Sequence, residues 1–350
     1  MRFKPFRYFV SGLLLLFAAA RAPRFLFADL SASERRNLYL SQTQTALGLS
    51  RNVGQISDAE GDFSRSLPRF ILIQDVHNHP EAQEHIASVI MHGYKFWGVK
   101  KVFLEGAFSS VDLSVFHRVP DLMRLALMKR LVQSGDLSGP ELAAVILSEA
   151  EWRNPPVNPF QLIGLESPRL YEQNLEVYQQ VQIHRDEALR ALEEIRRLQI
   201  GLQLLPSNPL PQQLVRTEDL IRLKMTPDEY AAYRSARFAI PSAPELDLAR
   251  RLAERFYSLV QERSHAFIVQ AEAKVPAGAG PRILVVGGFH TARMARELKA
   301  QGYSYVVITP RITRTGYESL YERRMLESIS ALQVTQPFSL PAAPHRQNGR

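Results

Sequence analysis

The stretch that most constrains the fold of this chain runs from Phe70 to Pro80 and has the sequence FILIQDVHNHP. The run Ile71–Ile73 is apolar and rich in β-branched residues, which predicts a short buried strand. Polar residues follow at once, and Pro80 suits the first position of a helix whose apolar residues recur at helical spacing from Ile86. A strand that ends in polar groups and turns into a helix is typical of the ligand-binding edge of an open α/β sheet.

A second stretch near the end of the chain has the same order of elements. Residues 282–290 have the sequence RILVVGGFH, which is an apolar strand followed by two glycines and a histidine. A helix and a further strand at Tyr305–Ile308 are predicted after it, just as the first stretch continues through a helix to a strand at Val102–Glu105. We therefore expect two βαβ units, which are either copies of one unit or independent units that share a common pattern.

Residues 1–28 predict a secretory signal peptide. Basic residues precede an apolar run at residues 9–20, which is short for a membrane span of about 20 residues, and small residues follow it. The alternative is an uncleaved anchor, which would be the protein's one link to a membrane. We expect an exported protein, either periplasmic or secreted. The chain has no cysteine, which excludes disulfides, thiolate ligands and a thiol nucleophile.

The remaining chain is predicted to be one α/β core with a helical insertion between two halves. A poorly ordered lead-in at 29–68, with one helix near 33–47, precedes a first half at 69–170 that has another strand at 160–166. The insertion at 171–280 consists of a long amphipathic helix from 171 to about 205 and two further helices at 212–236 and 244–272. It is either scaffold or a cap over the sheet edge. The second half covers 281–335, and 336–350 is predicted to be a disordered tail.

Acids and histidines follow four of the predicted strands. Asp75 and His77 follow the first, and Glu105, Glu166 and His290 each follow another. If these strands are parallel neighbours, their polar groups converge on one edge of the sheet. Two imidazoles and a carboxylate suit zinc, manganese or iron, with one position left for a water molecule that attacks a carbonyl group.

The candidate residues have different predicted roles. His77, Glu105 and His290 are candidate metal ligands and catalytic groups, and Asp75 is expected to orient His77. Gly287 would let a backbone or ligand approach closely. Two of these residues have a purely structural alternative. His77 could cap the next helix, and Glu105 could be an acidic residue of a turn.

Three further residues are predicted near the same edge. Glu166 is a weaker candidate for the site, and Arg311, after the last strand, is a candidate for contacting an anionic group of the substrate. His79 is better explained as a helix-start residue. The net charge of +8 is partly due to the first residues, and there is no basic run with interleaved aromatic residues, so nucleic acid is not an expected partner.

Three motifs together resemble one superfamily. These are QDVH at residues 74–77 with Gln83 on the following helix, VFLEG at 102–106, and GGFH at 287–290. They resemble the superfamily that joins Tiki proteases, TraB/PrgY proteins, ChaN-like haem-uptake proteins and erythromycin esterases. The resemblance implies a duplicated α/β core with His77, Glu105 and His290 at the site. The chain departs from the usual pattern at Gln74, where glycine is usual, and at Asp75, where glutamate is more common.

The superfamily includes metal-dependent peptide cleavage, ester hydrolysis and haem binding, and fold alone does not choose among them. The leading expectation is a hydrolase of an amide or ester bond, either metal-dependent or assisted by histidine and glutamate, that acts on a small molecule or peptide. The alternatives are a haem or iron-binding protein, with His77 or His290 as an axial ligand, and a non-catalytic member of the superfamily.

Overall fold

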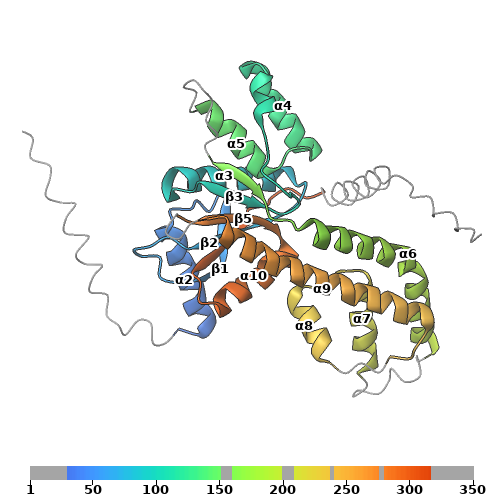
Figure 1. Ribbon diagram of the computed structural model, residues 1–350. Helices are drawn as coiled ribbons and strands as arrows, with labels where there is room; N and C mark the ends of the chain where they lie inside the picture. Colours follow the sequence, from blue (N-terminus) through green and yellow to red (C-terminus); the bar gives the residue numbers. More distant parts are fainter. Residues whose placement is uncertain (1–29, 151–159, 199–208, 237–239, 276–279, 317–350) are drawn as a thin grey trace, which may run out of the picture.

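The computed structural model describes residues 30–150, 160–198, 209–236, 240–275 and 280–316. This part of the chain is an α/β fold, in which one mostly parallel sheet has helices on both faces (Figure 1). The predicted signal peptide and the predicted tail lie outside the described residues. The fold class predicted from the sequence is confirmed.

The sheet of the described residues has the strand order β1-β6-β2-β5-β3-β4. The strands are β1 (Gly54–Glu60), β2 (Phe70–Asp75), β3 (Lys101–Leu104), β4 (Gln161–Gly164), β5 (Arg282–Gly287) and β6 (Tyr305–Pro310). β1 runs antiparallel to β6, and the other neighbours are parallel. The helices are α2 (Ala32–Ala46), α3 (Pro80–Trp97), α4 (Asp121–Ser134), α5 (Gly139–Ala150), α6 (Pro168–Leu198), α7 (Leu210–Ile221), α8 (Pro227–Ser235), α9 (Pro244–Ala273) and α10 (Gly288–Ala300), with a 3₁₀ turn at Ser114–Arg118.

The two predicted βαβ units interleave at the centre of the sheet. β2 and β5 pair in register from Phe70 opposite Arg282 to Asp75 opposite Gly287. β3 lies beside β5, and β6 lies beside β2, so each crossover passes over one strand of the other unit. Since right-handed crossovers in opposite directions place their helices on opposite faces, α3 and α10 cover different sides of the sheet. The carboxyl ends of β2 and β5 therefore lie next to each other.

The strand run predicted from Phe70 onward is buried on both faces. Ile71 and Ile73 pack in the cluster that contains α3, while Phe70 and Leu72 pack in the cluster that contains α9 and α10. All four side chains are fully buried. A continuous apolar run of this kind is expected for a parallel strand that is covered on both sides, where each side chain of this size contributes about 1.5–3 kcal/mol.

The segment before the first predicted strand is more regular than expected. α2 confirms the predicted helix near 33–47 and starts with a capping box formed by Ser31 and Glu34. The prediction of a poorly ordered lead-in is wrong for residues 30–60, because β1 joins the sheet as an edge strand. Its sequence, GQISDAE, is poor in strand-forming residues. The pairing with β6 and the buried amide of Gln44, which bonds backbone groups before and within β1, position it instead.

The described part of the helical insertion has one more helix than predicted. α6 and α9 confirm two of the predicted helices, and residues 199–208 lie outside the described residues. The predicted helix at 212–236 is instead two helices, α7 and α8. Leu223 adopts a left-handed φ of 55° between them. Thr226 and Glu229 then form a capping box, with a proline at the first turn of α8. The S/T-x-x-E pattern at residues 226–229 predicts the start of a helix.

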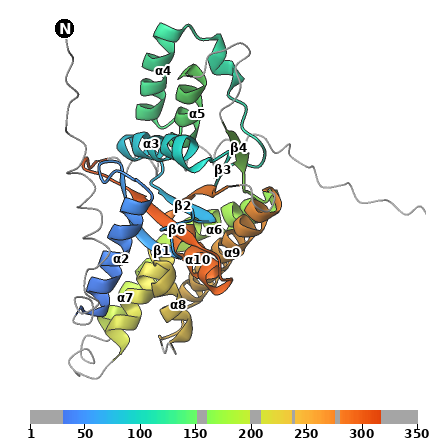
Figure 2. The same cartoon turned by 90° about the vertical axis from the view of Figure 1, so that its left-hand side faces the viewer.

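α9 joins the insertion to the sheet. Its amino-terminal half packs against α6, α7 and α8 through residues such as Ala253 and Tyr257, and its carboxyl-terminal half packs on the sheet through Phe267 and Ala271 (Figure 1). Figure 2 shows α9 and α10 on one side of the sheet, with α3, α4 and α5 on the other. The described helices include none that combines the length and apolar character needed to cross a membrane.

Residues 311–316 run along the first turns of α3 and are held there by Glu81. The Glu81 carboxylate accepts hydrogen bonds from Thr313 N (2.8 Å), Thr313 Oγ1 (2.6 Å) and Arg314 N (2.8 Å). His79 caps α3, as predicted, and its Nε2 lies 3.0 Å from Arg314 O. The hydrogen bonds from Thr313 and Arg314 lower the pKa of Glu81 to about 2.

We predict that Glu81→Gln destabilises the protein in a pH-dependent way. In an unfolded chain glutamate titrates near 4.5, whereas the pKa of Glu81 in the folded protein is about 2. The stabilisation is therefore fully present above pH 4.5 and is lost as the pH falls toward 2. Thermal unfolding should show a melting temperature a few degrees below that of the wild type at pH 7, with the gap closing between pH 4.5 and 2. Glu84→Gln, at a more exposed ion pair with Arg314, should change little. A gap that does not vary with pH would contradict the prediction.

Candidate functional site

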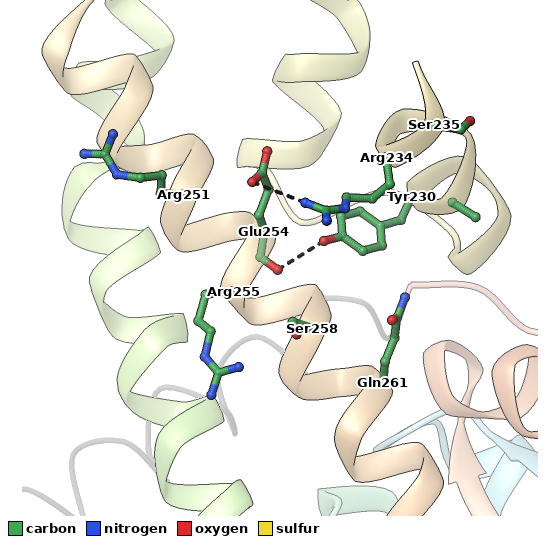
Figure 3. Close-up of a pocket in the computed structure, with 9 residues that line it drawn as sticks. Tyr230, Arg234, Ser235, Arg251, Glu254, Arg255, Ser258 and Gln261 are labelled. Carbon is green, nitrogen blue, oxygen red and sulfur yellow. Dashed lines mark hydrogen bonds and ion pairs between the residues drawn. The ribbon is translucent and has the colours of Figure 1, made fainter. Parts of the chain in front are cut away.

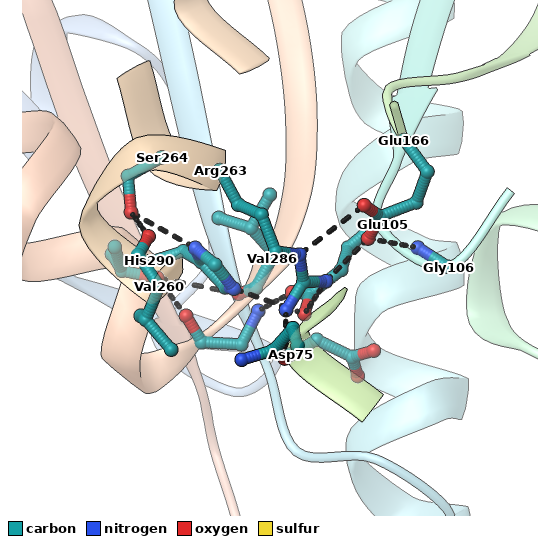
Figure 4. Close-up of polar contacts among 12 residues, drawn as sticks. Asp75, Glu105, Gly106, Glu166, Val260, Arg263, Ser264, Val286 and His290 are labelled. Carbon is teal, nitrogen blue, oxygen red and sulfur yellow. Dashed lines mark hydrogen bonds and ion pairs between the residues drawn. The ribbon is translucent and has the colours of Figure 1, made fainter. Parts of the chain in front are cut away.

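Five of the predicted site residues meet at one edge of the sheet. Asp75 ends β2, His77 follows it, Glu105 follows β3, Glu166 follows β4, and His290 lies in the first turn of α10 after β5. Since β2, β5, β3 and β4 are successive neighbours, their carboxyl ends bring these side chains together. Figure 4 shows four of them, Asp75, Glu105, Glu166 and His290. We call Asp75, His77, Glu105, Glu166, His290 and Arg263 of α9 the polar cluster.

Asp75 holds the imidazole of His77. His77 Nδ1 lies 2.7 Å from Asp75 Oδ2. Gln83 Nε2 donates to the other oxygen of Asp75 at 2.7 Å, and Gln83 Oε1 accepts from Gly139 N at 2.6 Å. The carboxylate is thus tied to both α3 and the start of α5, and the contact by which Asp75 was expected to orient His77 is present. The Nε2 atom of His77 lies on the side of Gly287, 3.1 Å from where a methyl group on that residue would be.

Glu105 is the centre of the cluster. Its Oε2 accepts from Gly287 N at 2.7 Å, and its Oε1 lies 3.2 Å from His290 Nε2 and 3.4 Å from Arg263 Nη2. Burial by itself favours the neutral acid, but the interactions with His290, His77 and Arg263 outweigh it and hold the pKa of Glu105 well below its ordinary value. Glu105 is therefore a carboxylate at neutral pH.

The imidazole of His77 is the more accessible of the two in the cluster. About a third of its side chain is exposed (34%), compared with 4% for His290. Burial disfavours its charged form, yet the carboxylates of Asp75 and Glu105 outweigh this effect and raise the pKa of His77 to about 9. His77 is therefore mainly an imidazolium at pH 7.

Gly287 allows the close approach that the sequence predicted. A methyl group at this position would lie 3.1 Å from His77 Nε2 and 3.4 Å from Glu105 Oε2. A side chain at this position would thus crowd His77 and touch Glu105. The groups that approach Gly287 in the structure are the protein's own side chains.

Arg263 is the member of the cluster that sequence reasoning missed. It is 6% exposed, its Nε lies 3.2 Å from Glu166 Oε2, and its Nη2 also bonds Glu166 Oε1. Its Nη1 donates to Asn174 Oδ1 of α6 at 3.0 Å. The signal was its place in the apolar stripe of α9, between Val260 and Phe267, since a charged residue in such a stripe needs a buried partner. The insertion therefore contributes to the site.

Ser264, beside Arg263, fixes the second histidine. Its Oγ lies 2.9 Å from His290 Nδ1 and 2.7 Å from Val260 O. A hydroxyl has one hydrogen, so Ser264 either donates to Val260 and accepts from His290 or donates to His290 directly. In both arrangements the two ring nitrogens of His290 are engaged, by Ser264 and by Glu105.

Two candidates are placed differently from the others. Glu166 contacts Arg263 and accepts from Gly106 N at 3.2 Å, so it supports the cluster from within. Arg311 is exposed, and its Nη1 lies 3.4 Å from Asn52 Oδ1, before β1. The structure does not bring Arg311 to the polar cluster, because the chain turns along α3 after β6.

The arrangement of the cluster does not fit a metal ion. Both oxygens of Glu105 already face hydrogen-bond donors from Gly287, His290 and Arg263, and the guanidinium of Arg263 supplies a positive charge where a cation would need to approach. Within the described ranges, no group of three or more histidine and acidic side chains is positioned to hold a metal.

A cavity of about 710 Å³ lies in the insertion between α8 and α9 (Figure 3), and no residue of the polar cluster lines it. Its lining includes Arg234, Arg251, Glu254 and Arg255. Arg255 is paired with Glu262, and Arg234 lies 3.8 Å from Glu254. These ion pairs are exposed, and the cavity contains none of the predicted site residues.

Comparisons of the chain with models of protein families, with curated proteins and with solved structures find no match.

We predict that Arg263→Met lowers the free energy of unfolding by about 3–5 kcal/mol, because it leaves Glu105 and Glu166 buried beside a missing cation. Urea denaturation at pH 7 measures this. Arg255→Met on the same helix is the matched control. Its ion pair with Glu262 is nearly half exposed, so it should cost less than about 1 kcal/mol. Equal losses in the two variants would show that the cluster does not depend on Arg263.

Proposed function

We propose that the protein hydrolyses an ester or amide bond through His77, without a metal ion. The observation that carries this proposal is the Asp75–His77 pair at the edge of the sheet. The Nδ1 atom of His77 is bound to the Asp75 carboxylate, and about a third of the His77 side chain is exposed (34%). A histidine held in this way can act as a general base. Its neutral Nε2 would remove a proton from a water molecule while the water oxygen attacks the carbonyl carbon.

The same imidazole completes the reaction. The proton taken from water stays on Nε2 until the tetrahedral intermediate breaks down, and it then passes to the leaving alkoxide or amine. Asp75 keeps the proton on Nδ1 and stabilises the imidazolium. Glu105 stays ionised because of its lowered pKa, so its role is to stabilise the positive charge on His77 and to position the cluster rather than to accept a proton. Arg263 and His290 hold Glu105 in place.

The raised pKa of His77 sets the pH dependence of this reaction. With a pKa of about 9, only a minor fraction of His77 is neutral at pH 7. That fraction grows nearly tenfold per pH unit until the pH approaches 9.

The resemblance to the Tiki, TraB/PrgY, ChaN-like and erythromycin esterase proteins supports hydrolysis and belongs to the proposal. Export through residues 1–28 and a small-molecule or peptide substrate are also parts of the proposal. Metal-dependent hydrolysis, haem or iron binding and a non-catalytic role stay predictions from the sequence, since no contact of the described residues specifically favours them.

We predict that the kcat/KM for p-nitrophenyl acetate rises with pH from 6 to about 9 and then levels off, because the neutral form of His77 is the base. His77→Ala should lower kcat/KM by roughly 10²- to 10⁴-fold, the usual contribution of a general base. His265→Ala, whose side chain is 60% exposed and paired with Glu297, should behave as the wild type. A rate that is independent of His77 would contradict the proposal.

We also predict that hydrolysis survives removal of metal ions. After dialysis against EDTA or 1,10-phenanthroline, the rate should stay within a factor of about two of the untreated rate, because the proposed reaction uses the imidazole of His77 as the base and no metal ion. A loss of activity that added zinc or manganese restores would instead support the metal-dependent alternative. A His77-dependent shift of the haemin absorption band would support haem binding.

A further inference from the structure

A cavity of about 460 Å³ adjoins the polar cluster through two consecutive glycines. Gly287 borders His77 and Glu105, and Gly288 lines the cavity. The other walls come from β1, the end of β2, β6, α10 and the start of α8. Because consecutive Cα atoms are about 3.8 Å apart, Gly288 places one wall of the cavity close to Gly287 and to the residues that border it.

Gln74 supplies a hydrogen-bond donor to the cavity. Its Oε1 accepts from Thr309 Oγ1 at 3.3 Å, and Thr309 Oγ1 also lies 3.0 Å from Ser57 Oγ. These contacts orient the amide so that Nε2 faces Gly288, where a methyl group would lie 3.0 Å from it. In the part of the chain that the structure describes, Nε2 has no hydrogen-bond acceptor. A bound group with an acceptor oxygen would satisfy it.

The charged groups of the cavity are already paired. Asp58 bonds Arg36 and accepts from the hydroxyl of Tyr305, and Asp228 bonds Arg296. Neither a cation nor an anion would therefore find an unmatched charge there. Together with the free donor of Gln74, this favours a neutral group that carries a carbonyl oxygen.

We propose that this cavity binds the acyl side of the substrate, and that Gln74 determines specificity by donating to a carbonyl oxygen of a neutral, amide-containing acyl group. This inference rests on the proposed hydrolysis at His77. It adds the class of substrate, an N-acylated amino acid ester or amide, and the residue that recognises it.

Two p-nitrophenyl esters with acyl chains of equal length test the inference. N-acetylglycinate carries an amide carbonyl group where pentanoate has methylene groups. After correction for spontaneous hydrolysis, the wild type should prefer N-acetylglycinate in kcat/KM, and Gln74→Leu should reduce this preference about tenfold, as expected for one lost hydrogen bond. Gln74→Glu keeps the size of the side chain but replaces the donor with an acceptor, so it should reduce the preference at least as much.

Gln55→Leu is the matched control, since Gln55 is exposed on β1 and lies outside the cavity. It should keep the wild-type preference. A preference that is unchanged in both Gln74 variants, in an enzyme that hydrolyses the esters, would overturn the inference and leave the proposed function standing.

If the wild type hydrolyses neither ester faster than His77→Ala, the proposed function fails, and binding then tests the cavity by itself. Saturation-transfer NMR with N-acetylglycinamide should show binding that Gln74→Leu weakens. Absence of binding, or binding equal in the two proteins, would overturn the assignment of the cavity.

Discussion

The carboxylate of Glu105 is the constraint on which the rest of the site depends. A buried carboxylate costs several kcal/mol in lost hydration unless positive charges and hydrogen-bond donors replace the water around it. Here the backbone of β5, the imidazole of His290 and the guanidinium of Arg263 provide that replacement. These groups come from two parts of the chain, the turn from β5 into α10 and the carboxyl-terminal half of α9, while Glu105 itself comes from a third. The need to satisfy one acid therefore fixes how the helical insertion sits against the sheet.

The interleaved topology explains why two distant histidines share this acid. β2 and β5 are parallel and in register, so the residues that follow them emerge at the same height of the sheet. The third strand of the site, β3, pairs with β5 and presents Glu105 to both. Because side chains alternate between the two faces of a strand, a shift of one residue in either pairing would move these groups apart. The apolar residues buried on both faces hold the register, and through it the geometry of the cluster.

The sequence was most informative where function and fold depend on local pattern. The apolar runs before Asp75 and His290 predicted the strands, and the polar residues at their ends predicted the edge that holds the site. Arg263 was not predicted as a site residue, because its partners Glu105 and Glu166 lie far away in the chain and only the tertiary structure joins them. β1 was missed for a similar reason, since backbone pairing and Gln44 position it rather than its own side chains. Arg311 was misplaced because a residue just after a strand can leave the sheet edge in any direction.

The carboxylates of Asp75 and Glu105 make His77 an imidazolium at neutral pH. Titration of the His77 ring by NMR, with isotope-labelled histidine and assignment by comparison with His77→Ala, measures this most directly. We expect a pKa of about 9 in the wild type and a clearly lower pKa in Glu105→Gln, where one of the two negative charges is removed. A pKa near the ordinary value of 6.5 in both proteins would show that Asp75 and Glu105 do not act on this ring as described, and it would contradict the account.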